Sequence, residues 1–441
     1  MDYSPTYVER LGKSVLGQSF DYYRPYVKSR TASWWRNGGT KAAINLSDKV
    51  PPAHPALLVM AIAVAASLLA ELRIGMLRVP VVVWEMGFGM LVGSQGLGLA
   101  RSSDILLEWL GRAGLAALFF MSGMELDLQK VKGRPLSLAV GGWSLSLAIA
   151  LAAGVVFHWV PQIHAPLMVS LVLTTTAMGT FLPILRDAGH LDSKFGSLVL
   201  AAGAVGEFGP VILVSLALTR VYGTWKEVAL MLGFVALAVV AALIALSVRP
   251  PRVLRLLERS MQSSTQLPVV LSVLLIAAFV SLSQAIGLES VLGGFAAGMV
   301  VGLASQGGGG RVFRVKVEAI CFGFLVPFFF VVSGMNLEVG LLVKDPEKLL
   351  LVPVFLLLFF IVRGTPVVLY RHDIGKSERL PFVLFSATAL PIVVAITDIG
   401  VRTGRLLPEI AAALVGAGLL SVLLFPAVAI ALLPRRSLKE P

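Results

Sequence analysis

The chain contains about thirteen uninterrupted apolar stretches, each of roughly 18–26 residues. A helix that crosses the hydrocarbon core of a bilayer needs about 20 such residues. Because 57% of the residues are hydrophobic and only 14% are charged, these stretches leave no room for a soluble catalytic domain. A membrane β-barrel is excluded because its strands alternate apolar and polar residues over about ten positions. The sequence therefore predicts an all-α membrane protein of about 13 transmembrane helices.

We expect three regions: an N-terminal tail at 1–53, a transmembrane domain at 54–435 and a short C-terminal tail at 436–441. The first tail carries eight basic residues among tyrosines and tryptophans, but it has no signal-peptide core. An interfacial segment on the lipid headgroups and plain disorder are both compatible with that composition. The spans are predicted at 54–72, 79–97, 107–126, 135–159, 165–185, 194–219, 227–248, 267–284, 286–304, 317–338, 348–370, 381–400 and 408–434.

Basic residues fall unequally on alternate connections between these spans. About twenty lysines and arginines lie on one set of connections and about seven on the other. The positive-inside rule places the richer set in the cytoplasm. With an odd number of spans, the N-terminus is predicted outside and the C-terminus in the cytoplasm, in the inner (plasma) membrane of a bacterium. Net charge of +12 distributed in this way reflects orientation, so no nucleic-acid partner is expected.

Three short motifs recur in the second half of the chain at nearly one offset. Residues 89–93 match 298–302 at 209 positions, and 122–127 match 333–338 at 211. Residues 174–178 match 386–390 at 212. Each copy lies seven spans from its partner, so the two copies cross the membrane in opposite directions. Such an inverted repeat is typical of secondary transporters, whose ion site lies near the midplane where broken helices meet.

The third repeated motif predicts those broken helices. Hydroxyls, glycine and proline interrupt the middle of both spans, and unwound backbone is tolerated in a bilayer only where it lines a cavity or is buried in protein. The alternative is that the hydroxyls only bond back to their own helices. The expected cation-binding oxygens belong to Thr174, Thr175, Thr176, Ser386 and Thr388, and the expected hinges are Gly179, Pro183 and Pro391.

Two charges lie deep inside predicted spans, Glu207 and Arg363. A charge at a helix centre costs about 2.5–3.5 kcal/mol, so each needs a partner, water or a function. The alternative is that the two residues form an ion pair with a structural role only. Glycines at 203, 206 and 209 suggest room for a hydrated cavity beside the glutamate. Three further groups of residues lie at span ends, in connections or in an apolar run and are not favoured as sites: the carboxylates Glu85, Glu125 and Asp398; the five histidines; and the lone Cys321.

The motif at 84–93, the Gly-Met-Glu-Leu-Asp core within 118–128, the Thr-rich span ending at 185–189 and the acidic span after it resemble the monovalent cation:proton antiporter-2 family. This resemblance covers about residues 55–435. It implies the inverted-repeat antiporter fold, with Glu207 as the ion-binding carboxylate and Arg363 as the charge-balancing residue. Well-known members have Asp-Asp, Asn-Asp or Gln-Asp where this chain has Gly206-Glu207, so their ion specificity is not carried over. The nucleotide-binding regulatory domain of many potassium-efflux members has no match here.

The predicted function is exchange of a monovalent cation, Na⁺ or K⁺, for protons by alternating access. A buried glutamate can hold either a proton or a cation but not both, and one core carboxylate predicts electroneutral one-for-one exchange. Two alternatives stay open: a sodium-coupled symporter of a small organic anion, with Arg363 binding the anion, and a non-transporting sensor or scaffold with the same fold. No enzymatic activity, cofactor or transition metal is expected. The expected partners are membrane lipid and a second copy of the chain in a homodimer.

Overall fold

The computed structural model describes residues 54–71, 79–94, 96–125, 133–157, 166–191, 193–219, 263–286, 290–305, 310–337 and 346–433, with isolated positions between 233 and 260 and at 288 and 340. Within these ranges the regular elements are all helices, in agreement with the predicted fold class. The tail before residue 54, most of the span expected at 227–248 and the segment 436–441 lie outside the described residues. Eight described helical segments are long and apolar enough to cross a membrane, and four apolar helices are shorter.

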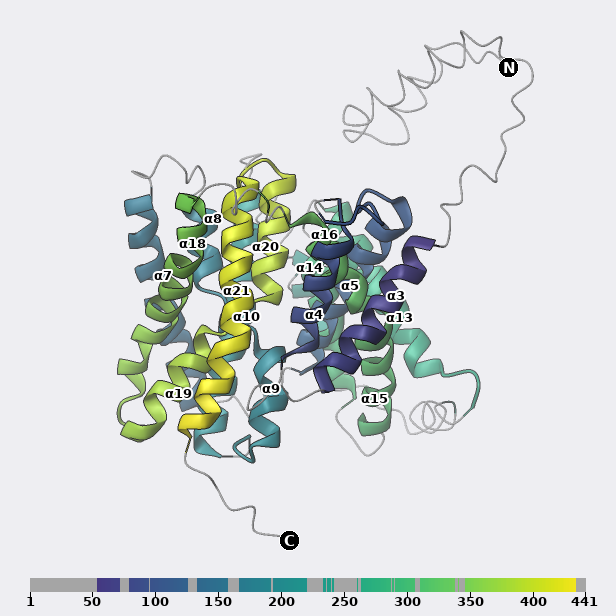
Figure 1. Ribbon diagram of the computed structural model, residues 1–441. Helices are drawn as coiled ribbons and strands as arrows, with labels where there is room; N and C mark the ends of the chain where they lie inside the picture. The colour runs from purple at the N-terminus through teal and green to yellow at the C-terminus, as the bar shows by residue number, and fades with distance from the viewer. Residues whose placement is uncertain are drawn as a thin grey trace, which may run out of the picture. The chain divides into compact units, whose positions relative to one another are not determined.

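The described helices pack as two bundles (Figure 1). The first, here called the scaffold bundle, contains α3 (His54–Glu71), α4 (Val81–Val92), α5 (Ile105–Glu125), α13 (Leu267–Ala285), α14 (Ser290–Ala304), α15 (Gly310–Ile320), a π-helical segment (Cys321–Leu325) and α16 (Val326–Asn336). The second, here called the crossing bundle, contains α7 (Arg134–Phe157), α8 (Pro166–Leu173), α9 (Met178–Asp187), α10 (Lys194–Thr219), α18 (Pro346–Gly364), a 3₁₀ segment (Thr365–Tyr370), α19 (Lys376–Ala387), α20 (Pro391–Arg402) and α21 (Pro408–Leu432).

Each helix that carries one of the first two repeated motifs packs against a helix that carries the other of these motifs, from the other half of the chain. The copy in α4 lies on α16, where a side chain at Gly93 would stand 2.9 Å from the Met335 backbone. Its partner in α14 lies on α5, where a side chain at Gly302 would stand 2.8 Å from the Met124 carbonyl oxygen. Small residues let helix backbones approach closely inside a membrane. Each repeat therefore contributes one helix to each of the two close helix pairs.

Two helices of the crossing bundle are interrupted near their middle. The first break, after α8, covers Thr174 to Ala177, and the second, after α19, covers Thr388 to Leu390. In Figure 1, α8 and α20 lie toward one end of the bundle and α9 and α19 toward the other, so the two interrupted helices run in opposite directions. The structure thus has the inverted repeat and the two broken helices that the sequence predicts.

The predicted hinges need one correction. Gly179 and Pro183 lie inside α9, so the first break precedes both. The break comes earlier because backbone groups of its residues find hydrogen-bond partners on other helices, as described below. Pro391 is the first residue of α20, a position where the missing N–H has no helical partner to lose.

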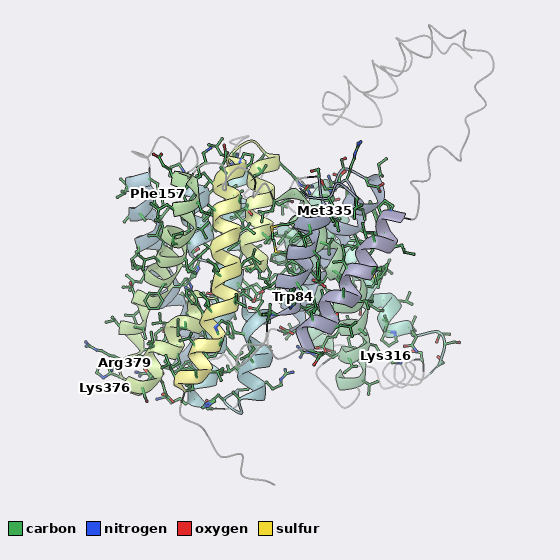
Figure 2. The ribbon with its side chains drawn as sticks, viewed as in Figure 1. Trp84, Phe157, Lys316, Met335, Lys376 and Arg379 are labelled. Carbon is green, nitrogen blue, oxygen red and sulfur yellow. The ribbon has the colours of Figure 1, made fainter. Side chains whose placement is uncertain are left out.

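Basic residues gather at one end of the helices. Figure 2 shows Lys316, Lys376 and Arg379 at the end opposite Phe157 and Met335, with Trp84 between. The connection before α19 is tied to two other connections at that end, because Asp373 Oδ1 lies 2.9 Å from Arg134 Nε and 3.4 Å from Lys194 Nζ. These contacts bring together three of the connections that the charge count assigns to the cytoplasm.

Candidate ion site

The two breaks bond directly to each other at the crossing. The Ala177 amide donates to the Thr388 carbonyl oxygen at 2.7 Å. The Thr176 hydroxyl donates to the Ser386 carbonyl oxygen at 2.6 Å. Unwound backbone buried in a membrane must satisfy its polar groups within the protein. The crossing provides these partners, and it explains why two separated breaks occur together.

Two prolines supply further acceptors to this region. Pro210 has no N–H, so the carbonyl oxygen of Gly206, four residues earlier, is free to accept the Thr176 amide at 2.9 Å. Pro366 likewise leaves the Val362 carbonyl oxygen open, and it accepts the Ser146 hydroxyl at 2.8 Å. Hydrogen bonds missing inside α10 and at the end of α18 are therefore replaced by bonds between helices.

Glu207 lies beside the crossing with only 4% of its surface exposed. The Ser122 hydroxyl of α5 donates to its Oε1 at 2.6 Å, while its Oε2 is buried without a hydrogen-bond partner. The carboxyl also faces the amide of Met178, the first residue of α9. A buried polar atom without a partner is rare and points to a function. Here the unpartnered atom is an acceptor that a proton or a cation can complete.

Arg363 is also 4% exposed, but it does not pair with Glu207. Both residues belong to the described part of the chain, and no ion pair within 4 Å joins them. Each guanidinium nitrogen instead donates to a neutral oxygen. Nε donates to Thr176 Oγ1 at 2.9 Å and to the Ser386 carbonyl oxygen at 3.3 Å, Nη1 to Ser146 Oγ at 3.2 Å and Nη2 to the Ala202 carbonyl oxygen at 3.1 Å. Arg363 therefore connects both broken helices to α7 and α10.

The glycines around Glu207 do not enclose a hydrated cavity, contrary to the prediction. A side chain at Gly206 would meet Arg363 Nη2 and, at 2.6 Å, Thr176 Oγ1. At Gly203 it would meet Phe181 at 2.9 Å, and at Gly209 it would meet Trp143 at 2.5 Å. The space beside each glycine is already occupied by a neighbouring side chain. These glycines let neighbouring side chains pack closely against α10. The sequence alone does not distinguish a glycine that allows close packing from one that borders an open cavity.

The other predicted oxygen donors have different partners. The hydroxyls of Thr174, Thr175 and Thr388 donate to carbonyl oxygens of their own helices at 2.7, 2.8 and 2.9 Å, as the back-bonding alternative describes. Among these hydroxyls, Thr176 makes the bond that crosses between the broken helices. The Ser386 hydroxyl is buried without a partner. Thr176, Ser386 and Arg363 thus meet at the crossing, with the backbone of Gly206 joining Glu207 to them.

The carboxylates expected at span ends divide into two groups. Glu125 pairs with Arg314 at 3.7 Å, and Asp398 pairs with Arg402 at 3.0 Å, as terminal charges do. Glu85 lies near the start of α4, as predicted, but only 3% of its surface is exposed. The short α4 lies against α16, where Gly334 packs on the backbone of Met86, the residue after Glu85. No group of three His, Cys, Asp or Glu residues among the described residues has metal-binding geometry.

Ser122, Ser146, Pro210 and Pro366 contribute to the site and are absent from the prediction. The role of the prolines could have been predicted from the sequence, because each proline frees the carbonyl oxygen four residues earlier within an apolar span. Ser122 belongs to a repeated motif but points to no partner in the sequence. Its role depends on the packing of α5 against α10.

Cavities between the bundles lead toward Glu207 from the end that contains Arg402. The largest of those described, about 240 Å³, is lined by polar side chains of both bundles, including Glu108, Arg112, Asn336, Asp398 and Arg402. Deeper, a space of only about 10 Å³ is lined entirely by Phe119, Val211, Val214, Val291, Ala395, Ile396 and Ile399. Val211 lies one turn beyond Glu207 on α10, and Phe119 one turn from Ser122 on α5. This apolar layer separates the polar cavity from the carboxyl.

An inverted repeat, two crossed broken helices and a buried carboxyl beside the crossing define an ion-coupled secondary transporter. The model of the family described as "Sodium/hydrogen exchanger, transmembrane" matches residues 60–433. The chain belongs to this family, whose members are ion transporters of the membrane and not enzymes.

Named relatives agree with this assignment. The chain is 26% identical over 341 residues to the putative Na⁺/H⁺ antiporter YjbQ of Bacillus subtilis, covering 74% of this chain and 54% of the relative. It is 27% identical over 263 residues to the Na⁺/H⁺-K⁺ antiporter GerN of Bacillus cereus, covering 58% and 65%. The chain thus spans about half to two thirds of these relatives' length. The solved sodium proton antiporter MjNhaP1 of Methanocaldococcus jannaschii shares the fold, with a TM-score of 0.57, 15% identity and coverage of 86% and 95%.

Proposed function

We propose that this protein exchanges a monovalent cation, Na⁺ or K⁺, for protons across the membrane, with Glu207 as the shared site. The observation that carries the proposal is the Glu207 carboxyl itself, buried beside the crossing with one oxygen held by Ser122 and the other unpartnered. A carboxylate in an apolar environment is stabilised by one positive charge. A proton and an alkali cation therefore compete for it, and their competition is exchange.

Hard cations are bound by oxygen ligands. Hydroxyl and carbonyl oxygens of both breaks lie at the crossing, and we assign the remaining cation contacts to Thr174, Thr175, Thr176, Ser386 and Thr388. Arg363 balances the charge of the carboxylate without touching it, while its hydrogen bonds hold the crossing together. The organic-anion alternative is not favoured, because each guanidinium nitrogen already donates to a protein oxygen.

Transport requires access to Glu207 from one side at a time. The apolar layer that includes Phe119, Val211 and Ile396 closes the path from the polar cavity. This structure then represents a state closed toward that end of the bundle, which the charge count assigns to the outside. Movement of the crossing bundle against the scaffold bundle would open the layer.

The experiment is dissipation of a pH gradient in proteoliposomes, with Na⁺, K⁺ and Li⁺ offered in turn. Glu207→Gln keeps the size of the side chain and removes its charge, so the fold should survive or gain stability. Exchange should fall to the protein-free background. Glu318→Gln on α15 is the matched control, since Glu318 is partly exposed and pairs with Arg314 at 2.9 Å. A well-folded Glu207→Gln variant that exchanges at the parental rate would place the site elsewhere.

We also propose that the tail at 1–53 lies outside the cell and 436–441 in the cytoplasm of a bacterium, in a homodimer. Accessibility labelling of single cysteines, after replacement of Cys321, tests the orientation. Both termini on one side would contradict the odd number of spans. Cross-linking in native membranes tests the dimer, and a chain that stays monomeric there would refute it.

A further inference from the structure

The hydrogen bond between Ser122 and Glu207 joins the two bundles. Ser122 lies on α5 of the scaffold bundle and Glu207 on α10 of the crossing bundle. Among the described helices, α10 of the crossing bundle also touches α14 of the scaffold bundle. At that contact the ring of Phe208, next to Glu207, packs against the ring of Phe295 at an angle of 33°, with centroids 4.0 Å apart. The carboxyl proposed to carry the ion is therefore part of the bundle interface.

Both ends of this bond are fixed within their own bundle. On the scaffold side, Gly294, Gly298 and Gly302 of α14 lie directly against carbonyl groups of α5. Gly123, next to Ser122, packs reciprocally against the α14 backbone, where an added Cβ would stand 2.9 Å from the Met299 nitrogen. With no side chain between the two helices, α5 has little freedom to shift against α14.

On the crossing side, the residue before Glu207 is held by the bond from the Thr176 amide to the Gly206 carbonyl oxygen. Arg363 adds a bond to Ala202, one turn earlier on α10. Sliding of one bundle on the other must consequently break the 2.6 Å bond between Ser122 and Glu207, because neither helix can follow the other.

The strength of this bond depends on the charge of Glu207. A hydrogen bond to an ionised carboxylate is roughly twice as strong as one between neutral groups. Binding of a proton or a cation neutralises the carboxylate and weakens the bond. We propose that Ser122 is a positioning residue that retains the empty, ionised Glu207 at the interface and releases it when an ion is bound. An exchanger needs this property, since an empty carrier that changes conformation turns exchange into leak.

This inference rests on the proposed function, and its test measures leak and exchange separately. Purified protein is placed in liposomes with a pH gradient, with N-methylglucamine as the only cation besides protons and thiocyanate as a permeant counter-ion. The parental protein should leak protons at the background rate. Ser122→Ala should raise that leak by about tenfold or more, as loss of a bond to a charged group predicts. Addition of Na⁺ or K⁺ should still drive exchange.

Two variants separate this role from a structural one. Ser122→Thr keeps the hydroxyl and should restore the low leak. Ser283→Ala removes a buried hydroxyl of the same bundle that donates only to the Val280 carbonyl oxygen at 2.8 Å, so it should behave as the parent. If Ser122→Ala does not fold, Ser122→Cys replaces it, and its weak S–H donor should give an intermediate leak.

Parental exchange without extra leak in Ser122→Ala would refute the role of Ser122 and leave the proposed function intact. Loss of exchange together with an unchanged leak would also refute it, because the hydroxyl would then be an obligatory ligand. Absence of exchange in the parental protein itself, with every alkali cation, would refute the proposed function instead.

Discussion

Replacing Gly206 with alanine tests whether Arg363 is held at the crossing as the structure shows. The added methyl group would overlap Arg363 Nη2 and lie 2.6 Å from Thr176 Oγ1. Thr176 has little room to move, because its side chain is stiff and its amide is bonded to the Gly206 carbonyl oxygen. The guanidinium must therefore shift, and its bonds to Thr176 and Ala202, now 2.9 and 3.1 Å long, would be lost.

Two lost bonds from a charged donor cost about 3–6 kcal/mol, at about 1.5–3 each. Alanine is favoured over glycine inside a helix by about 1 kcal/mol. We expect Gly206→Ala to destabilise the protein by about 2–5 kcal/mol, measured as a lower unfolding midpoint in detergent. Exchange in proteoliposomes should fall as well, because the crossing is displaced beside Glu207.

Gly179→Ala is the matched control. Gly179 lies in α9, and an added Cβ there would have no neighbour within 4 Å. This variant should be as stable as the parent or slightly more stable, by up to about 1 kcal/mol, with unchanged exchange. If Gly206→Ala unfolds and exchanges like Gly179→Ala, the described packing of Arg363 is incorrect. If Gly179→Ala slows exchange, Gly179 acts as a hinge despite its helical conformation.

Two other predictions concern charged groups of the crossing bundle. Arg363→Ala should destabilise the fold and reduce exchange. Arg363→Lys should do so less, since the charge is kept, although one ammonium group cannot reach the acceptors on both broken helices, α7 and α10; equal unfolding midpoints for the two variants and the parent would contradict this. The hydrogen bond from Arg134 holds the pKa of Asp373 below its usual range, so Asp373 adds stability that is present above the ordinary aspartate pKa and is lost as the pH falls through the lowered one. Asp373→Asn should therefore unfold at a lower temperature than the parent at pH 7 and at the same temperature in strong acid, and a difference independent of pH would refute the assignment.

The spans and the breaks were predictable because they follow from local physical demands. A bilayer requires continuous apolar runs, and proline with clustered hydroxyls interrupts a helix wherever it occurs. The inverted repeat was readable because motifs such as 89–93 and 298–302 retain the small residues that close helix packing requires. These features share that they are recognised from residue types along the chain, without knowing which helices meet.

The contacts of the site were not predictable in the same way, because they depend on which distant helices meet. The glycines near Glu207 are compatible with an open cavity or with a filled one, and only the positions of Phe181, Arg363 and Trp143 decide between them. The first break ends before Gly179 because the Thr176 amide finds the Gly206 carbonyl oxygen. Glycine and proline indicate where a helix can be interrupted, while the helices packed around it determine where the interruption occurs.

The charge that moves in each transport cycle follows from the charges of Arg363 and Glu207. Arg363 is surrounded by neutral oxygens and remains charged, because arginine does not lose its proton in proteins. Among the described residues, Glu207 is then the one titrating carboxyl beside the crossing, and it binds a single positive charge whether the ligand is a proton or a monovalent cation. Both directions of the cycle would move the same charge, so exchange should be electroneutral. We expect a Na⁺ or K⁺ concentration jump on a solid-supported membrane to release protons without a net transport current. A sustained current of constant sign would show that a second titrating group takes part.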